Sequence, residues 1–185
     1  MSLLFFSVSH ATEDAQQPIS QLPPQHPVWL LVDTQAMKLE VKQGEKTLEV
    51  FEDIAVGRGG VGNKQFRGDD VTPRGTYRIG WINEKSPFRR FYGIDYPNRD
   101  DVQKAYDDGL ITEQDYKRLM DALREKRVPP QNTPMGGHLG IHGLGGADAK
   151  IHRAMNWTHG CIALTNKQID RLDRWITTGT VVKIK

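Results

Sequence analysis

The chain of 185 residues has a single cysteine, Cys161, and no segment approaches the roughly twenty apolar residues that a membrane-spanning helix needs. One cysteine excludes an internal disulfide and any zinc module built on several cysteines. The 25 basic and 23 acidic residues leave a net charge of +2, which excludes the strongly basic surface of a nucleic-acid-binding protein. What remains is the composition of one ordinary domain with a hydrophobic core.

The first 27 residues differ from the rest of the chain. Residues 1–11 (MSLLFFSVSHA) hold a short apolar run and then small residues, which predicts a signal peptide with a truncated start and an exported, periplasmic or cell-envelope protein. The alternative is an apolar N-terminus without an export role. Residues 12–27 are polar and rich in proline, as in a linker. The folded domain is therefore expected at residues 28–185.

Short apolar and alternating stretches predict a mainly β fold with α-helical insertions. Strands are expected over residues 28–33, 37–41, 48–51, 54–56, 76–82 and 180–184. A helical insertion at about 97–130 interrupts this pattern, with one helix over 101–108 and a second one capped by Thr112. Near the end of the chain, Thr165 and Gln168 form a capping box that starts another helix.

The segment 138–166 concentrates the reactive side chains, because it holds Cys161 and four of the six histidines. If 138–142 is a strand, His138 and His142 share one face, and the same count puts His159 beside Cys161 on a strand over 159–164. Two such strands, packed through their aliphatic faces, present the imidazoles and the thiol together. That is the arrangement of a cysteine nucleophile with a histidine base.

Neighbouring residues supply the other parts of an acyl-transfer site. Gly160 precedes Cys161, and the amides of both are candidate donors to an oxyanion. Exposed carbonyls after His142 are suited to hold its imidazole in one tautomer.

Other aromatic and histidine side chains are assigned simpler roles. The aromatic residues of segment 86–96 are expected to form core or cleft wall. We expect Trp157 to serve packing, and His138 and His152 to be bystanders near the rim.

His142, fifteen intervening residues and then 158–161 (THGC), followed by Asn166, resemble the signature of the L,D-transpeptidase (YkuD-type) catalytic domain. Upstream, residues 72–77 (TPRGTY) resemble the family's Thr-Pro-x-Gly-x-aromatic segment. Residues 179–182 (GTVV) resemble its closing strand.

The resemblance covers roughly residues 28–96 and 136–185 and implies an L,D-transpeptidase-like β-sandwich that acts on peptidoglycan stem peptides without a cofactor or metal. Cys161 would attack the carbonyl before the terminal D-alanine, with His142 as the base. The thioester would then pass to an amine, which gives a 3-3 cross-link or attaches an envelope lipoprotein. Alternatively, water would accept it, as in an L,D-carboxypeptidase or in hydrolysis of peptidoglycan–lipoprotein links.

The resemblance also implies supporting roles. The carbonyl of Gly143 would orient the base, and Gly160 would help to form the oxyanion hole. Thr158 and His159 would shape the pocket.

One position departs from the family pattern. Many members have an arginine two residues after the cysteine, where this chain has Ala163. By parity that side chain would face the active site and hold a substrate carboxylate. Arg153 and Arg74 are the candidates to replace it.

Two rival interpretations are open. A zinc ion could take the ligands His138, His142, His159 and Cys161, although no acidic residue is well placed behind them. Bound zinc in the purified protein would favour that site. The second rival is a non-catalytic wall-binding domain on the same scaffold, because folds persist after their chemistry is lost.

Overall fold

The computed structural model describes residues 27–185, which form a large mixed β-sheet, a separate pair of short strands and several helices. In chain order the elements are β1 (Val28–Asp33), β2 (Lys38–Gln43), β3 (Lys46–Glu52), β4 (Val61–Gly62), β5 (Thr72–Pro73), β6 (Gly75–Asn83), β7 (Phe91–Ile94), α1 (Arg99–Asp107), α2 (Glu113–Arg124), β8 (Gly140–His142), α3 (Ala149–Ala154), β9 (Ile162–Ala163), α4 (Asn166–Leu172), the 3-10 turn η1 (Asp173–Trp175) and β10 (Val181–Ile184). The mainly β fold class is confirmed. The predicted signal peptide, and all of the predicted linker except its last residue, lie outside the described residues.

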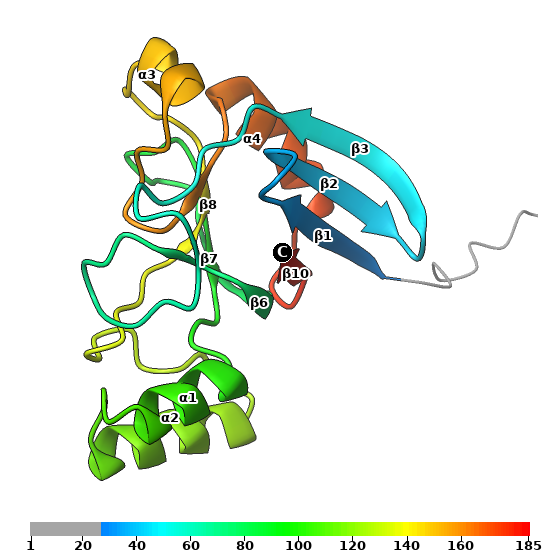
Figure 1. Ribbon diagram of the computed structural model, residues 1–185. Coiled ribbons are helices and arrows are strands. Elements are labelled where there is room, and N and C mark those ends of the chain that lie inside the picture. Colours follow the sequence, from blue (N-terminus) through cyan, green and yellow to red (C-terminus); the bar gives the residue numbers. More distant parts are fainter. Residues whose placement is uncertain (1–26) are drawn as a thin grey trace, which may run out of the picture.

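Eight strands form one sheet in the order β3-β2-β1-β10-β6-β7-β8-β9, and β4 pairs with β5 separately. This sheet closes on itself. Ala55, just after β3, exchanges two backbone hydrogen bonds of 3.0 and 2.8 Å with Ala163 of β9 at the other end. The two layers expected of a sandwich are therefore two halves of one curved sheet, with β1–β3 and β6–β8 in different orientations (Figure 1).

The core follows from the alternation of apolar side chains in the strands. Fully buried residues of β1 alternate with partly exposed ones, and Leu39 and Val41 of β2 are fully buried on either side of Glu40, which is also buried. The same hydrophobic cluster continues into the strands of the other half, with the members Leu30, Val32, Leu39, Tyr92, Ile94, Ile141 and Ile162. Because Ile141 and Ile162 belong to it, the core fixes the positions of β8 and β9.

Helices α1 and α2 lie in the predicted helical insertion, at the opposite end of the molecule from α3 (Figure 1). Helix α1 begins at Arg99, two residues earlier than predicted, because Asn98 forms a capping box with Asp101. Helix α2 begins after Thr112, as predicted, and the Thr112 side chain accepts a hydrogen bond from the Asp115 amide. Among the described residues, none of the helices combines the length and the apolar character needed to cross a membrane.

The start of α4 agrees with its predicted capping box. The Thr165 hydroxyl accepts from the Gln168 amide at 3.3 Å, and the Gln168 side chain accepts from the Thr165 amide at 2.8 Å. The Gln168 side chain also donates to the Glu52 carbonyl at 2.7 Å, at the end of β3. This cap therefore joins the last helix to the strand that precedes the sheet closure.

We predict that Thr165→Ala lowers the free energy of unfolding by about 1 kcal/mol, because the first turn of α4 loses its side-chain cap. Urea unfolding followed by circular dichroism measures the change. Thr178→Ala is the matched control, since Thr178 is exposed and its hydroxyl makes no hydrogen bond within residues 27–185. Equal losses in the two variants would contradict the capping role.

Candidate active site

His142 ends β8 and is held in one tautomer. Its side chain is buried, and Nδ1 donates to the Gly143 carbonyl, with 2.6 Å between the two atoms. The carbonyl acceptor expected for His142 is thus present. Since Nδ1 carries the proton, Nε2 is left as an acceptor, and it has no hydrogen-bond partner within the described part of the chain.

Aromatic rings surround the His142 imidazole. Its ring centroid lies 4.5 Å from that of Phe88 and 6.0 Å from that of Phe91, which is stacked at 12°. Trp157 packs against it edge-on, at 5.9 Å and 75°. Burial lowers the pKa of His142 below its ordinary value, and the Gly143 carbonyl offsets part of that effect. His142 is therefore neutral at physiological pH, as a general base must be.

The loop that carries the Gly143 carbonyl is locked by α4. The Asn166 side chain accepts from the Gly145 amide at 2.9 Å and donates to the Gly145 carbonyl at 2.8 Å. A Cβ atom on Gly143 would lie 2.8 Å from the Phe88 carbonyl oxygen and 2.9 Å from Asn166 Oδ1. Only glycine fits here, and Asn166 fixes the loop that orients His142.

Cys161 lies immediately before β9. The register pairs Ile141 with Ile162 in parallel, which places Cys161 beside Gly140 on the neighbouring strand. The thiol is half-buried, and Sγ lies 3.7 Å from the carbonyl oxygen of His138, to which it donates. Burial raises the pKa of Cys161 to about 11, and the Gly140 amide and the Lys64 ammonium offset part of that rise.

Thr158 shapes the turn that presents Cys161. Its hydroxyl donates to the Cys161 carbonyl at 2.7 Å and accepts from the Gly160 amide at 3.2 Å. Gly160 has a φ of +114°, and a Cβ atom there would lie 2.7 Å from the Val71 carbonyl oxygen. Because the Gly160 amide is already engaged, the Cys161 amide, which has no acceptor among residues 27–185, is the better placed oxyanion donor.

The predicted common face is wrong for His138 and His159, which lie outside the strands, but it agrees with the register for His142 and Cys161. The parallel pairing of His142 with Ala163 puts both on one face, and alternation puts Cys161 on that face as well. Strand β8 starts only at Gly140, and His138 before it has a φ of +54°, so its ring does not follow the strand alternation. Strand β9 starts after Cys161. The two strands are parallel neighbours in one sheet and do not pack through opposing faces. His138 lies next to the thiol through its backbone carbonyl, which corrects its assignment as a bystander.

His159 lies at the surface. Its side chain is 75% exposed, and Nδ1 lies 2.7 Å from a carboxylate oxygen of Asp70. Arg58 donates to the other oxygen of the same carboxylate at 2.7 Å. Arg58 and then His159 lower the pKa of Asp70. His159 thus belongs to a charged surface cluster, and its predicted role in the pocket stays a prediction.

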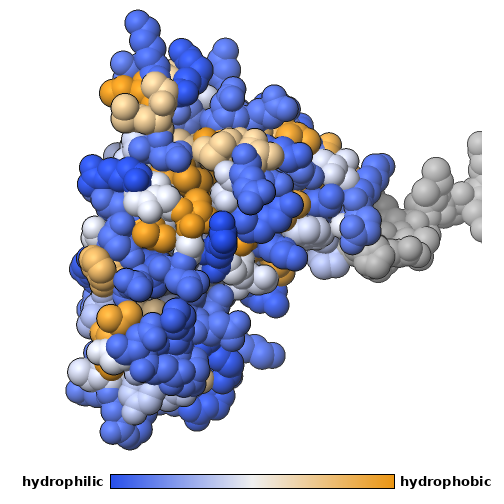
Figure 2. Space-filling view, in the orientation of Figure 1, coloured by the Kyte–Doolittle hydropathy of each residue, from blue (hydrophilic) through white to orange (hydrophobic). Residues whose placement is uncertain are grey.

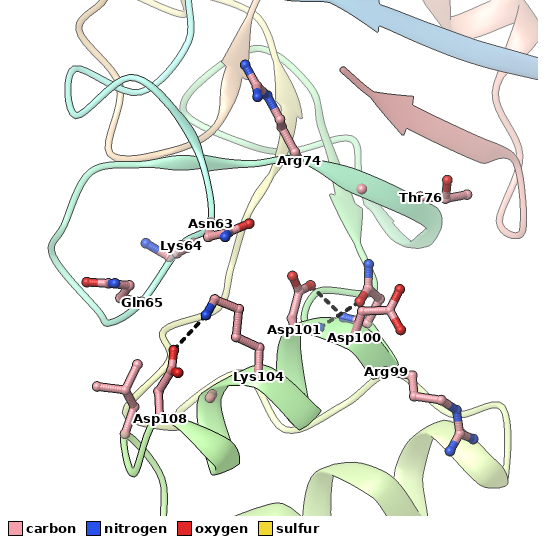
Figure 3. A pocket seen from close by; sticks show the side chains of 14 residues that line it. Asn63, Lys64, Gln65, Arg74, Thr76, Arg99, Asp100, Asp101, Lys104 and Asp108 are labelled. Carbon is pink, nitrogen blue, oxygen red and sulfur yellow. Dashed lines mark hydrogen bonds and ion pairs between the residues drawn. The ribbon is translucent and has the colours of Figure 1, made fainter.

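Lys64 was not predicted and is the residue that sequence reasoning missed near the thiol. Its side chain is almost fully buried and forms an ion pair with Asp69. Lys64 also lines a cavity of about 450 Å³ between residues 63–65, the start of β6 and α1 (Figure 3). Neither Cys161 nor His142 lines that cavity. A single lysine after a glycine-rich loop carries no sequence signal for such a position.

The candidate carboxylate partners lie apart from each other. Ala163 is fully buried and pairs in register with His142, so its side chain is on the His142 face of the sheet, as parity predicted. Arg74 lines the cavity of Figure 3, although its guanidinium points away from Asp101 and Lys104. Arg153 lines a separate cavity of about 280 Å³ on α3. The face in Figure 2 is largely hydrophilic, with hydrophobic residues gathered between α3 and the α1–α2 pair.

The rival zinc site lacks a ligand set. Within residues 27–185, no three side chains of histidine, cysteine, aspartate or glutamate come together as metal ligands would. His159 is bound to Asp70, and His142 uses Nδ1 for the Gly143 carbonyl. The buried histidine–cysteine neighbourhood is therefore the candidate site.

We predict that alkylation of Cys161 by iodoacetamide accelerates about tenfold per pH unit between about pH 7 and pH 10, because the thiolate stays scarce below a raised pKa. Mass spectrometry of the intact protein measures the rate, and Cys161→Ala gives the background. For glutathione, measured under the same conditions, the alkylation rate should stop rising near the pKa of its own thiol. A plateau for Cys161 below about pH 9 would contradict the prediction.

Comparison with known proteins places residues 27–184 in one family. The family model of the YkuD L,D-transpeptidase catalytic domain matches residues 27–184. No curated protein matches the sequence.

Solved structures with a similar fold include the helical cell shape determining protein Pgp2 from Campylobacter jejuni, with 21% identity and a TM-score of 0.57 over 86% of this chain and 48% of that one. Bd1075 from Bdellovibrio bacteriovorus has 19% identity and a TM-score of 0.54, over 86% of this chain and 48% of that one. An L,D-transpeptidase from Xylanimonas cellulosilytica has 14% identity and a TM-score of 0.49, over 86% of this chain and 61% of that one. This chain spans about half the length of the first two. By the match over residues 27–184, it belongs to the family of YkuD-type L,D-transpeptidase catalytic domains.

Proposed function

We propose that this chain is a cell-envelope enzyme that forms a thioester between Cys161 and a peptidoglycan stem peptide. One observation carries the proposal: within an L,D-transpeptidase domain, a buried neutral histidine with a free Nε2 ends the strand beside the only cysteine. A histidine held in this tautomer next to a thiol is the arrangement of a cysteine acyltransferase.

The first step starts from an uncharged pair. Sγ turns from the His138 carbonyl toward His142, and Nε2 takes the thiol proton as the sulfur attacks the carbonyl carbon before the terminal D-alanine. The Cys161 amide donates to the oxyanion. When the carbon–nitrogen bond breaks, His142 returns the proton to the leaving amine. D-Alanine departs, and the acyl group remains on Cys161.

The second step depends on the acceptor. An amine of another stem peptide gives a 3-3 cross-link, and an amine of an envelope lipoprotein gives its attachment. Water gives an L,D-carboxypeptidase, or a hydrolase when the thioester comes from a peptidoglycan–lipoprotein link. In every case His142 removes a proton from the acceptor as it attacks the thioester. The site thus supports transfer and hydrolysis through one intermediate.

Export is part of the proposal. Peptidoglycan lies outside the cytoplasm, and the predicted signal peptide over residues 1–11 would take the domain there. No cofactor or metal enters the proposed steps.

We predict that the purified protein converts tetrapeptide muropeptides and that Cys161→Ala abolishes this, because no other thiol is present. Mass spectrometry separates the outcomes: cross-linked dimers identify an amine acceptor, and tripeptides identify water. A trapped acyl-enzyme on Cys161 would show the thioester directly. Product that survives in Cys161→Ala would refute the mechanism, and binding without any product would favour the non-catalytic wall-binding domain.

The pH dependence of kcat/KM provides a separate prediction. Because burial lowers the pKa of His142, the base stays neutral as the pH falls through the ordinary histidine pKa of about 6.5. Activity should therefore persist below pH 6.5 and be lost only when the pH falls to the lowered pKa of His142 in the folded protein. Circular dichroism at each pH separates unfolding from titration. An acid limb at or above pH 6.5, in protein that remains folded, would contradict the assignment of His142.

A further inference from the structure

His152 on α3 is buried, although it was expected at the rim. Only 4% of its surface is exposed. Its Nδ1 accepts a hydrogen bond from the Trp157 indole N–H, with 3.3 Å between the nitrogens. Since Nδ1 is the acceptor, the proton of the neutral ring is on Nε2. Within residues 27–185, this Nε2 is the one buried side-chain nitrogen or oxygen without a hydrogen-bond partner.

Trp157 connects His152 to both parts of the candidate site. Its ring packs edge-on against the His142 imidazole and completes the wall made by Phe88 and Phe91. The next residue, Thr158, holds the turn that presents Cys161. A change in the orientation of the indole would therefore reach the base directly, by contact.

The backbone before Trp157 is fixed independently of His152. The Asn156 side chain accepts from the Val56 amide at 3.1 Å, and the Thr158 amide donates to the Val56 carbonyl at 3.3 Å. Neither bond involves the indole ring. Among the described residues, the bond to His152 is the hydrogen bond that fixes the indole N–H.

We propose that His152 is a positioning residue for the base: it holds the Trp157 ring against His142 and thereby sets the orientation of His142 toward Cys161. This role rests on the proposed function, in which His142 moves the proton. His152 itself touches neither substrate nor thiol in the proposed steps.

The surroundings of His152 keep it in the form that can accept this bond. Burial lowers the pKa of His152, and the nearby Arg153 acts in the same direction. Asp53, through its backbone carbonyl and its charge, opposes them. His142, on the far side of Trp157, is the remaining titratable neighbour. Protonation of Nδ1 would remove the acceptor, so the positioning requires the neutral ring.

A positioning role and a purely structural role of His152 predict different effects on stability, because an unpaired buried N–H destabilises a fold. His152→Leu removes the acceptor for Trp157 and also removes the unpaired Nε2–H. We expect kcat on muropeptides to fall about 10- to 100-fold with KM within about twofold, because the base is misplaced while substrate contacts remain. The melting temperature should stay equal or rise.

Matched variants complete the test. His152→Asn keeps an oxygen near the Nδ1 position and should restore most of kcat. Lys150→Leu, a change at an exposed position of the same helix, should leave kcat and melting temperature as in the wild type. Trp157→Phe in the His152→Leu background should cause little further loss, since both changes break the same link. Loss of kcat in proportion to lost folded protein would overturn the proposal, as would an unchanged kcat.

A measurement without substrate keeps this proposal separate from the proposed function. In protein labelled with ¹³C-histidine, the His142 ring signal reports the nearby Trp157 ring current. It should shift in His152→Leu and stay in place in His152→Asn and Lys150→Leu. A His142 signal that does not move in His152→Leu refutes the positioning role. If muropeptides are not converted by the wild type, the function fails, while the ring signal still decides whether His152 positions His142.

Discussion

The parallel pairing of β8 with β9 is the constraint on which the candidate site depends. Parallel neighbours need a crossover of a dozen or more residues, and here residues 143–161 form it, with α3 inside it. His142 ends the first strand and Cys161 precedes the second, so the crossover brings both to one region. The fixed spacing between His142 and the 158–161 motif is thus the length of a strand connection.

Burial then sets the protonation of the pair. It lowers the pKa of His142 and raises that of Cys161, so that both are neutral at rest. A preformed thiolate–imidazolium pair is not what this environment favours. In the proposed mechanism the proton moves as the sulfur attacks, so the orientation of Nε2 toward the thiol would be decisive. Gly143 holds one nitrogen of that ring, and the aromatic wall holds its faces.

Local signals in the sequence were sufficient wherever a few adjacent residues decide the structure. Thr112 and Thr165 cap their helices as predicted, and the Gly143 carbonyl meets His142. Parity failed at His138, because it assumes an extended chain and His138 has a φ of +54° before β8 begins. It agreed with the register for His142 and Cys161. Helix α3 is too short for a periodic pattern to reveal.

Long-range contacts were beyond the sequence for a different reason. Lys64 and Ala55 gain their importance from Cys161 and Ala163, which are far along the chain, and no spacing rule links them to the candidate site. The pairing of Ala55 with Ala163, which closes the sheet, is one such contact that the sequence pattern does not predict.

Ala163 is the position where many relatives have an arginine, and here it is fully buried in that closure. A guanidinium would have to leave this buried place to reach water or a carboxylate, since an unpaired buried charge is strongly unfavourable. In the proposed reaction, a substrate carboxylate would therefore have to be bound by a cation at another position. Lys64 lies close enough to influence the thiol, but it is already paired with Asp69. The closure of the sheet at Ala55 and Ala163 thus disfavours a charged side chain at position 163.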